Sequence, residues 1–427
     1  MDTERALVPR IRDALTAACP ATREGGPSDA VAGVAPALVG SPASTAQASA
    51  LLAAAAAHDL TVVPRGAGLG LGWGLPPASC DLVVDMSLMG EVIEHAAGDL
   101  VARVQAGATI GHLASVLAQA GQQLALDAPA HATVGGVVAT GTAGPRRFRY
   151  GAPRDLLIGL TAVRADGVVA HSGGKVVKNV AGYDLGKLFA GSQGTLGLIT
   201  EATFRLHPQP PAVAWVAGEF GPSDRAGAVA AVAAAAGSAL VPSAVELDWP
   251  GGSQRPLRVG VLVEGTSSGV AERAKQFSEL MAAAGGAAAV TDVPPARWGQ
   301  LPTSSVVIRV SFWVSSLGAV LEALAAAAAD AGVRPAASGP AGAGALYACL
   351  DPGTSEDDAA RFVAILRERI GGIQGARGSV VVLAAPPPVL EAVSATGMIP
   401  GVALMRAVKD QFDPGHRMFP GRLMEGS

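Results

Sequence analysis

The chain has 427 residues, of which 15% are charged, and its 31 basic and 35 acidic residues give a formal net charge of −4. This length has room for two domains, and the charge balance argues against a basic nucleic-acid surface or a polybasic membrane patch. Three scattered cysteines exclude an internal iron–sulfur cluster, which needs about four closely spaced thiolates. With no secretory h-region and no transmembrane segment expected, the composition predicts a cytoplasmic protein.

Near the N-terminus, strands and helices are expected to alternate. Strands are predicted over 30–39 and 60–64, and a helix over 46–58 lies between them, capped by Ser44 or Thr45. Another strand follows at 81–85. This order predicts a small parallel β-α-β unit, whose ligand site would lie at the carboxyl end of the strands.

Glycine occupies every second position from Gly66 to Gly74, between the strands at 60–64 and 81–85. Glycine costs conformational entropy, so this density indicates that backbone N–H groups must approach an anion closely, such as a nucleotide pyrophosphate. A Rossmann fingerprint is excluded, because no G-x-G-x-x-G frame fits and no crossover helix has room before residue 81. We therefore expect a glycine-rich loop between two strands.

Two further glycine-rich runs, at 133–144 and 191–200, occur in a second α+β part. The other elements predicted there are strands over 91–95, 100–105, 152–164 and 167–171 and a helix over 109–120. Three glycine-rich segments in one region predict a single extended ligand that lies across the junction of two lobes.

A proline-rich boundary at 208–211 separates this region from the rest of the chain. Beyond it, strands and helices alternate in a pattern that predicts an antiparallel sheet covered by helices on one face. The predicted strands are 212–220, 244–249, 257–264, 305–313, 345–350 and 379–383, and the predicted helices are 224–236, 268–284, 317–331 and 356–370. A short helix is expected in the last piece, 405–423.

The glycine-rich segments, together with 178–185 and 413–422, resemble the vanillyl-alcohol oxidase (PCMH-type) FAD-binding family and its D-2-hydroxyacid oxidase branch. The pattern is most similar to the second FAD-binding (E) subunits of glycolate oxidases. The resemblance implies an α+β fold with an α/β first lobe. It implies a two-lobed FAD-binding domain over 1–208 (lobes 1–88 and 89–208), an α+β cap domain over 209–394, and a C-terminal segment, 395–427, that packs back on the FAD-binding domain.

The resemblance also implies which segments hold FAD. The first loop would wrap the pyrophosphate and adenosine, residues 133–144 would lie against the flavin and ribityl chain, and Ile199 would offer backbone groups on the adenine side. The implied cofactor-binding residues are Pro64, Arg65, Gly66, Ala67, Gly68, Leu69, Gly70, Pro129, Thr133, Val134, Gly135, Gly136, Ala139, Thr140, Gly141, Gly144, Tyr150, Gly151, Asp155, Gly194, Gly197 and Ile199. Many relatives attach FAD through a histidine or cysteine in these loops, and neither is present here, so we expect non-covalent FAD.

No catalytic residue and no metal ligand is assigned. Oxidation of a 2-hydroxyacid needs a base or a metal, and a cation for the carboxylate, and catalytic relatives use histidines of the cap. None of the seven histidines lies between residues 208 and 415. Several residues keep two interpretations. Arg65 and Arg154 could contact the phosphates or form salt bridges, and His131 could be a flavin neighbour or an ordinary loop histidine. Lys178 and Asn179 could face the flavin edge or stabilise a turn, and Arg255, Arg258 and Arg309 could bind a carboxylate or be solvated.

Three hypotheses follow. The first is an FAD-binding subunit of a glycolate (2-hydroxyacid) oxidase that works with a catalytic FAD subunit and an iron–sulfur subunit, in the cytoplasm or at the inner membrane face through those partners. The second is a self-sufficient FAD oxidoreductase for another hydroxy substrate. The third is a non-catalytic scaffold subunit. The intact glycine-rich loops count against the third.

Overall fold

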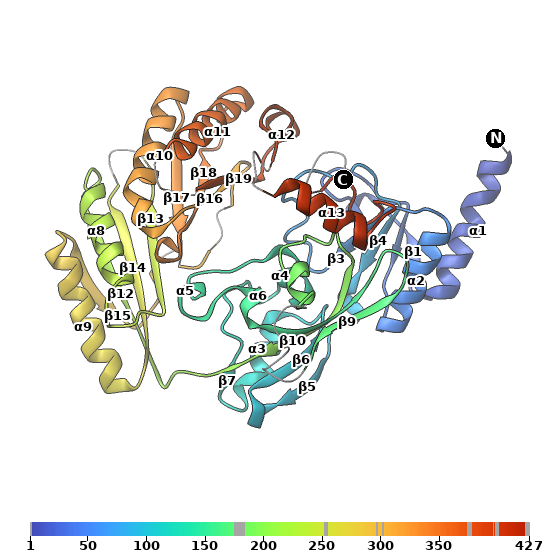
Figure 1. The fold of residues 1–427 in the computed structure, drawn as a ribbon, viewed down its shortest axis with the longest axis horizontal. Coiled ribbons are helices and arrows are strands. Elements are labelled where there is room, and N and C mark those ends of the chain that lie inside the picture. Colours follow the sequence, from blue (N-terminus) through green and yellow to red (C-terminus); the bar gives the residue numbers. More distant parts are fainter. Residues whose placement is uncertain are drawn as a thin grey trace. The chain divides into compact units, whose positions relative to one another are not determined.

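The computed structural model describes residues 2–174, 184–251, 255–295, 298–300, 303–373, 378–395, 397 and 401–422 (Figure 1). The chain forms two compact units. The first unit comprises Met1–Ala143, Ala152–Gln209 and Pro400–Ser427, and the second comprises Gly144–Gly151 and Pro210–Ile399. Residues 144–151, which we placed in the FAD-binding domain, belong to the second unit. The units also divide the chain after Gln209 and Ile399, where we predicted boundaries after residues 208 and 394.

The first sheet of the first unit has four strands, in the order β1 (Thr22–Glu24), β2 (Leu38–Gly40), β4 (Leu82–Asp85) and β3 (Val62–Arg65). Strands β2, β4 and β3 are parallel, as predicted, and helix α2 (Thr45–Ala57) begins at Ser44, whose Oγ accepts from Gln47 N. Helix α1 (Asp2–Ala18) packs on α2. Adjacent parallel strands need a crossover connection, usually a helix. Here residues 66–81 make that crossover between β3 and β4.

The predicted strand over 30–39 is wrong except at its end. Residues 31–34 form a turn closed by hydrogen bonds between Val31 and Val34, and only β2 is extended. The turn has positive φ at Ala32 and Gly33, which a strand cannot accommodate.

The second sheet of the first unit is antiparallel, in the order β5 (Val92–Ala96), β6 (Val101–Gln105), β10 (Leu198–Arg205), β8 (Leu157–Val163) and β9 (Val169–Gly173). A two-stranded pair joins β7 (Gln122–Gln123) to β11 (His207–Pro208). The helices of this part are α3 (Ile110–Ala118), α4 (Val134–Thr140), α6 (Pro153–Leu156) and α7 (Gly186–Phe189). The strand predicted over 152–164 begins as α6, because Pro153 suits the first helical position and the Asp155 carboxylate accepts from Ala152 N.

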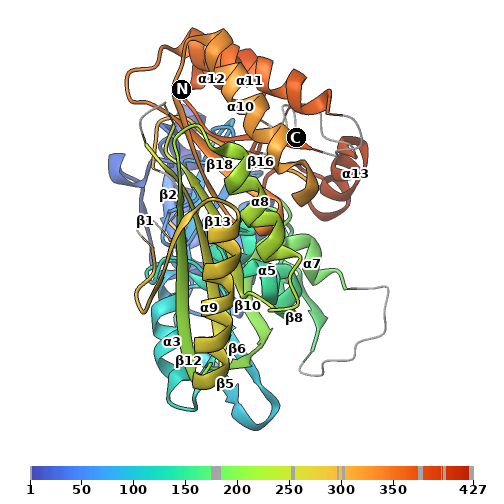
Figure 2. The same cartoon turned by 90° about the vertical axis from the view of Figure 1, so that its left-hand side faces the viewer.

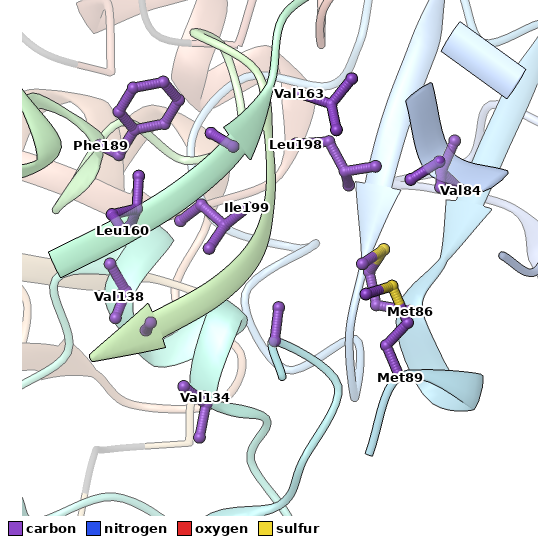
Figure 3. Packing of buried hydrophobic residues seen from close by; sticks show 14 of the residues in the cluster. Val84, Met86, Met89, Val134, Val138, Leu160, Val163, Phe189, Leu198 and Ile199 are labelled. Atoms are coloured by element: carbon purple, nitrogen blue, oxygen red, sulfur yellow. The ribbon is translucent and has the colours of Figure 1, made fainter. Parts of the chain in front are cut away.

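One hydrophobic cluster joins the two sheets of the first unit. Val134 and Val138 of α4 belong to this cluster together with Leu160 of β8 and Ile199 of β10 (Figure 3). Met86, which follows β4, belongs to the same cluster. The short helix α4 is thus held by core packing rather than by helix propensity, which is poor for a segment with two adjacent glycines.

The second unit contains an antiparallel sheet, as predicted, and this sheet has eight strands where six were expected. Its order is β15 (Ala287–Thr291), β12 (Ala212–Phe220), β14 (Leu257–Gly265), β13 (Ala244–Trp249), β17 (Pro335–Gly339), β18 (Ala345–Leu350), β16 (Val307–Ser311) and β19 (Ser379–Ala384). Its helices are α5 (Arg147–Tyr150), α8 (Arg225–Ala236), α9 (Ser267–Ala283), α10 (Leu317–Ala331), α11 (Glu356–Gly371) and α12 (Pro387–Val393). Helices α8 and α9 pack on β12 and β14, and α8 also contacts α10 (Figure 2).

One apolar helical stretch, Val314–Ala331, is long and apolar enough to cross a membrane by length and composition alone. Its main part, α10, packs on α8 and α11 and buries Val320, Leu321 and Leu324. This is the arrangement of a core helix in a folded domain.

The C-terminal segment belongs to the first unit. Helix α13 (Val402–Phe412) packs there through an edge-to-face contact between Phe412 and Phe189, whose ring centroids lie 5.6 Å apart. The chain then runs beside β3, where Val62 N donates to Arg417 O and Phe419 N donates to Val62 O, each at 2.8 Å. The last described residues therefore lie next to the strand that leads into the glycine-rich loop.

Candidate functional site

The first and second glycine-rich segments are in contact within the first unit. A Cβ added at Gly66 would lie 2.0 Å from Thr133 Oγ1, and one added at Gly70 would lie 2.7 Å from Thr140 Cγ2. Real Cβ atoms do not approach other atoms this closely, so the loop can rest against α4 only because both positions lack a side chain. The structure thus brings together residues that are far apart in sequence and that were predicted to share one ligand.

The third segment reaches the same place. Gly191 N donates to Val138 O at 3.0 Å, which ties the segment to α4. A Cβ at Gly194 would lie 3.2 Å from Pro64 Cγ, so the segment also lies against the end of β3. All three predicted segments therefore line one region of the first unit.

The backbone donors of the first loop stand out. Among the described residues, the N–H groups of Ala67, Gly68, Leu69 and Gly70 donate to no protein acceptor. The next part of the loop is closed on itself, since Leu71 N donates to Gly68 O at 3.1 Å. Four successive free N–H groups form a site suited to an anion.

The backbone donors at the start of helix α4, in the second segment, already have acceptors. Val134 N donates to Ala108 O at 2.9 Å, Gly135 N donates to Ala106 O at 2.7 Å, and Gly136 N donates to the capping Thr133 Oγ1 at 3.3 Å. Helix α4 therefore offers a ligand small side chains rather than free N–H groups. Between the first loop and α4, it is the first loop that has free N–H groups for the phosphates.

Arg65 has two carboxylate partners. Its Nη1 lies 3.0 Å from Asp29 Oδ1 and its Nη2 lies 2.8 Å from Asp85 Oδ2. Hydrogen bonds from Arg23 and Gly26 N, with a further one from Arg65, hold the pKa of Asp29 well below its usual range. Of the two interpretations of Arg65, the salt bridge is the one that its side chain makes. Arg154 is exposed.

The side chain of Arg422 is a part of this site to which we gave no role. It is 2% exposed, and its guanidinium donates to the carbonyl oxygens of Gly70, Leu71 (3.0 Å) and Leu75 (3.2 Å), all in the first loop. Its Nε donates to Gln193 Oε1 of the third segment at 3.0 Å. The only sequence signal was the terminal Pro420-Gly421-Arg422 motif, which does not reveal these partners.

Lys409 also fixes the C-terminal segment. Its buried Nζ donates to Thr195 O and Met418 O at 2.8 Å and forms an ion pair with Asp413 Oδ2 at 2.5 Å. Met418 N also donates to that Asp413 oxygen, at 2.7 Å. These hydrogen bonds offset part of the cost of burying a charged pair, although Asp413 Oδ1 has no hydrogen-bond partner among the described residues. The segment is thereby fastened to the third glycine-rich segment.

The structure places the remaining predicted residues as follows. Gly144, Tyr150 and Gly151 belong to the second unit, where Tyr150 OH lies 2.9 Å from Glu264 Oε2, and burial together with that carboxylate raises the pKa of Tyr150 to about 12. Asp155 caps α6. Pro129 and His131 are exposed and precede α4, whose last turn and C-cap contain Ala139 and Gly141. Gly197 lies against Val163 O, and Ile199 is buried in β10. Lys178 and Asn179 lie outside the described residues.

The second unit contains a half-buried arginine on its sheet. Among the described residues, Arg309 Nε of β16 is buried without a hydrogen-bond partner, and Arg309 pairs in register with Tyr347 of β18. Arg258 instead forms an exposed ion pair with Glu219, and Arg255 is exposed. No group of three His, Cys, Asp or Glu residues placed to hold a metal occurs in the described parts of the chain.

Comparison with known proteins identifies the domain that contains the first two glycine-rich segments. Residues 36–173 match a family model described as FAD binding domain. This stretch of the chain is an FAD-binding domain. It contains the first loop and α4, and its four free N–H groups and the close approach at Gly66 fit the pyrophosphate of FAD. The prediction of FAD as the cofactor is confirmed.

The relatives of this FAD-binding domain include two hydroxyacid enzymes. The glycolate oxidase subunit GlcD of Bacillus subtilis is 37% identical over 171 residues, which are 40% of this chain and 36% of that protein. The D-lactate dehydrogenase of Archaeoglobus fulgidus is 39% identical over 173 residues, 39% of this chain and 38% of that protein. The chain thus spans less than half the length of these relatives.

The fold extends over the whole chain. A crystal structure of p-cresol methylhydroxylase with substrate bound has a TM-score of 0.76 at 16% identity, and the match covers 98% of this chain and 97% of that one. At this identity the match establishes the fold alone. It confirms the predicted PCMH-type fold.

Proposed function

We propose that this chain is an FAD-binding subunit of an oxidoreductase that acts on the CH–OH group of a small 2-hydroxyacid such as glycolate, and that it holds FAD non-covalently. The observation that carries the proposal is the FAD-binding domain at 36–173, whose relatives include proteins named for glycolate and D-lactate. Loop residues 66–74 contain no histidine and 133–144 contain no cysteine, the residue types through which relatives attach FAD. This supports a non-covalent cofactor.

Different described residues would bind the FAD and the substrate. The N–H groups of Ala67 to Gly70 would hold the pyrophosphate, and the small residues of α4 would allow the cofactor to lie close to the backbone. FAD, when bound, supplies the acceptor for the two electrons and the hydrogen removed from the substrate. Arg309, a half-buried cation with an unpartnered Nε, is our candidate ligand for the substrate carboxylate.

A base for the hydroxyl proton is the missing part. Because the sequence has no histidine between residues 208 and 415, we propose that the chain works within a glycolate-oxidase-like complex. The partners would be a catalytic FAD subunit and an iron–sulfur subunit, and this chain would be the second FAD-binding (E-type) subunit. We place the complex in the cytoplasm or at the inner face of the membrane through those partners. A self-sufficient oxidoreductase and a non-catalytic scaffold are the alternatives.

Anaerobic mixing of the purified chain with glycolate and D-lactate tests this proposal. The protein should be yellow, and acid precipitation should release the FAD into solution. We expect slow or no bleaching of the flavin by the chain alone and fast bleaching after its genomic neighbours are co-expressed.

Each failure has a distinct meaning. Flavin retained on the precipitate would contradict non-covalent binding. Rapid bleaching of the isolated chain would contradict the need for partners. A complete complex that binds FAD and is not bleached by any 2-hydroxyacid would refute the substrate class.

In an active complex, Arg309→Met should raise KM for the acid more than it lowers kcat, whereas Arg258→Met, at an exposed ion pair, should change neither.

A further inference from the structure

Arg422 lies behind the loop that carries the four free N–H groups. Its Nη2 donates to Gly70 O, its Nη1 donates to Leu71 O and Leu75 O, and its Nε donates to Gln193 Oε1. The guanidinium carbon also lies 4.6 Å from the centroid of the Phe419 ring. Every one of these partners is neutral.

A buried guanidinium without a carboxylate is unusual. Burying a charge costs free energy unless it is paired, and Arg422 is 2% exposed. Burial lowers the pKa of Arg422 to about 10, so the side chain is still charged at neutral pH. Among the described residues, Arg422 forms no ion pair. Within the described part of the chain, the positive charge of Arg422 therefore lies behind the loop without a carboxylate partner.

Arg65, at the start of the same loop, has the opposite arrangement. Two carboxylates, Asp29 and Asp85, neutralise it. Its charge therefore adds little net positive potential for a ligand. Of the two arginines that contact the ends of the loop, Arg422 is the one whose charge can still attract an anionic ligand.

We propose that Arg422 is a positioning residue for the pyrophosphate of FAD. The guanidinium holds the carbonyl groups of Gly70, Leu71 and Leu75 on one side, which fixes the turn that leaves the N–H groups of Ala67 to Gly70 free. The bound diphosphate then supplies the negative charge that Arg422 lacks. This inference rests on FAD binding by the first unit, and it assigns to the C-terminal segment a part in cofactor affinity.

The test compares FAD affinity in three variants of the full chain, measured on apoprotein by flavin fluorescence at several salt concentrations. Arg422→Gln should weaken FAD binding by about tenfold to a hundredfold and reduce the dependence of affinity on salt. Arg422→Lys keeps the charge but not the multipoint clamp, and we expect about three- to tenfold weaker binding with the wild-type salt dependence. Arg417→Gln is the matched control, because Arg417 lies in the same segment but donates to Ala165 O, away from the loop.

Thermal unfolding of each apoprotein separates positioning from general stability. If Arg422→Gln binds FAD as tightly as wild type, or loses no more affinity than an Arg417→Gln protein of equal melting temperature, the proposal is overturned. If Arg422→Gln does not fold, Arg422→Lys decides, and wild-type affinity in that variant would overturn the proposal. Wild-type apoprotein that fails to bind FAD would refute the cofactor assignment itself, whereas the first two outcomes leave that assignment intact.

Discussion

The first loop and helix α4 are both rich in glycine, yet they use it for different purposes. In the loop, the N–H groups of Ala67 to Gly70 have no acceptor among the described residues. In α4, Gly135 N donates to Ala106 O, and a Cβ at Gly135 would lie 2.8 Å from Ala106 Cβ. Glycine in the loop keeps donors open to a ligand, whereas glycine in α4 allows a helix to pack against the backbone that follows β6.

This difference shows how a glycine-rich motif should be interpreted. The runs 66–74 and 133–144 contain five and four glycines, so the count does not distinguish an anion site from a close packing contact. What distinguishes them is where the N–H groups donate. Substitutions in the two segments should therefore have different effects, in one case on FAD affinity and in the other on the free energy of unfolding.

The largest effect is expected at Gly66. In Gly66→Val, the new Cβ would overlap Thr133 Oγ1, which lies 2.0 Å from the ideal position, and the loop would have to move away from α4. We expect FAD affinity to fall by about a hundredfold or more and unfolding to become easier by about 1–3 kcal/mol. Titration of apoprotein with FAD and chemical denaturation measure the two effects.

A double variant shows whether this clash is the cause. With Gly66→Ala, removal of the hydroxyl by Thr133→Ala leaves Thr133 Cβ as the nearest atom, at 3.2 Å. The double variant should regain part of the FAD affinity that Gly66→Ala loses alone. Its free energy of unfolding should fall by about 1 kcal/mol, because α4 loses its N-cap. Wild-type FAD affinity in Gly66→Val would show that the loop and α4 need not be in contact.

The next effect concerns α4. Gly135→Ala places a methyl group against Ala106 Cβ and within 3.1 Å of Ala106 O, so we expect a loss of about 1–3 kcal/mol in stability. FAD affinity, measured well below the melting temperature, should change far less than in Gly66→Val. Ala106→Gly should relieve the methyl contact and restore part of the stability. A large loss of FAD affinity with no loss of stability would show that Gly135 contacts the cofactor directly.

The sequence predicted the second unit more accurately than the first. Strands β12, β13 and β18 and helix α10 match the predicted ranges residue for residue, because alternating or periodic apolar residues define them. Strands β15 and β17 were missed. Both are short and rich in alanine, glycine or proline, which have low β-propensity, and they form through pairing with neighbouring strands.

Within the site, the loop and its position between two strands were predictable, but its partners were not. Helix α4 had readable signals: Thr133 as N-cap, Val134, Val137 and Val138 at helical spacing, and Gly141 as a left-handed C-cap. The glycines in its first turn concealed them. Arg422 and Gly70 are 352 residues apart, and no local pattern reveals a contact over that distance.

The smallest effect compares two glycines of the first loop. Gly68 has φ +79°, where a side chain is strained, although a Cβ would have nothing closer than Leu71 Cδ1 at 3.9 Å. Gly72 has no positive φ and nothing within 4 Å of an added Cβ. Gly68→Ala should therefore cost about 1–2 kcal/mol of backbone strain, shared between stability and an about fivefold loss of FAD affinity, whereas Gly72→Ala should match wild type in both. Equal losses in the two variants would mean that the loop tolerates no added side chain anywhere. In that case the close approach of FAD, rather than backbone conformation, would set the requirement for glycine.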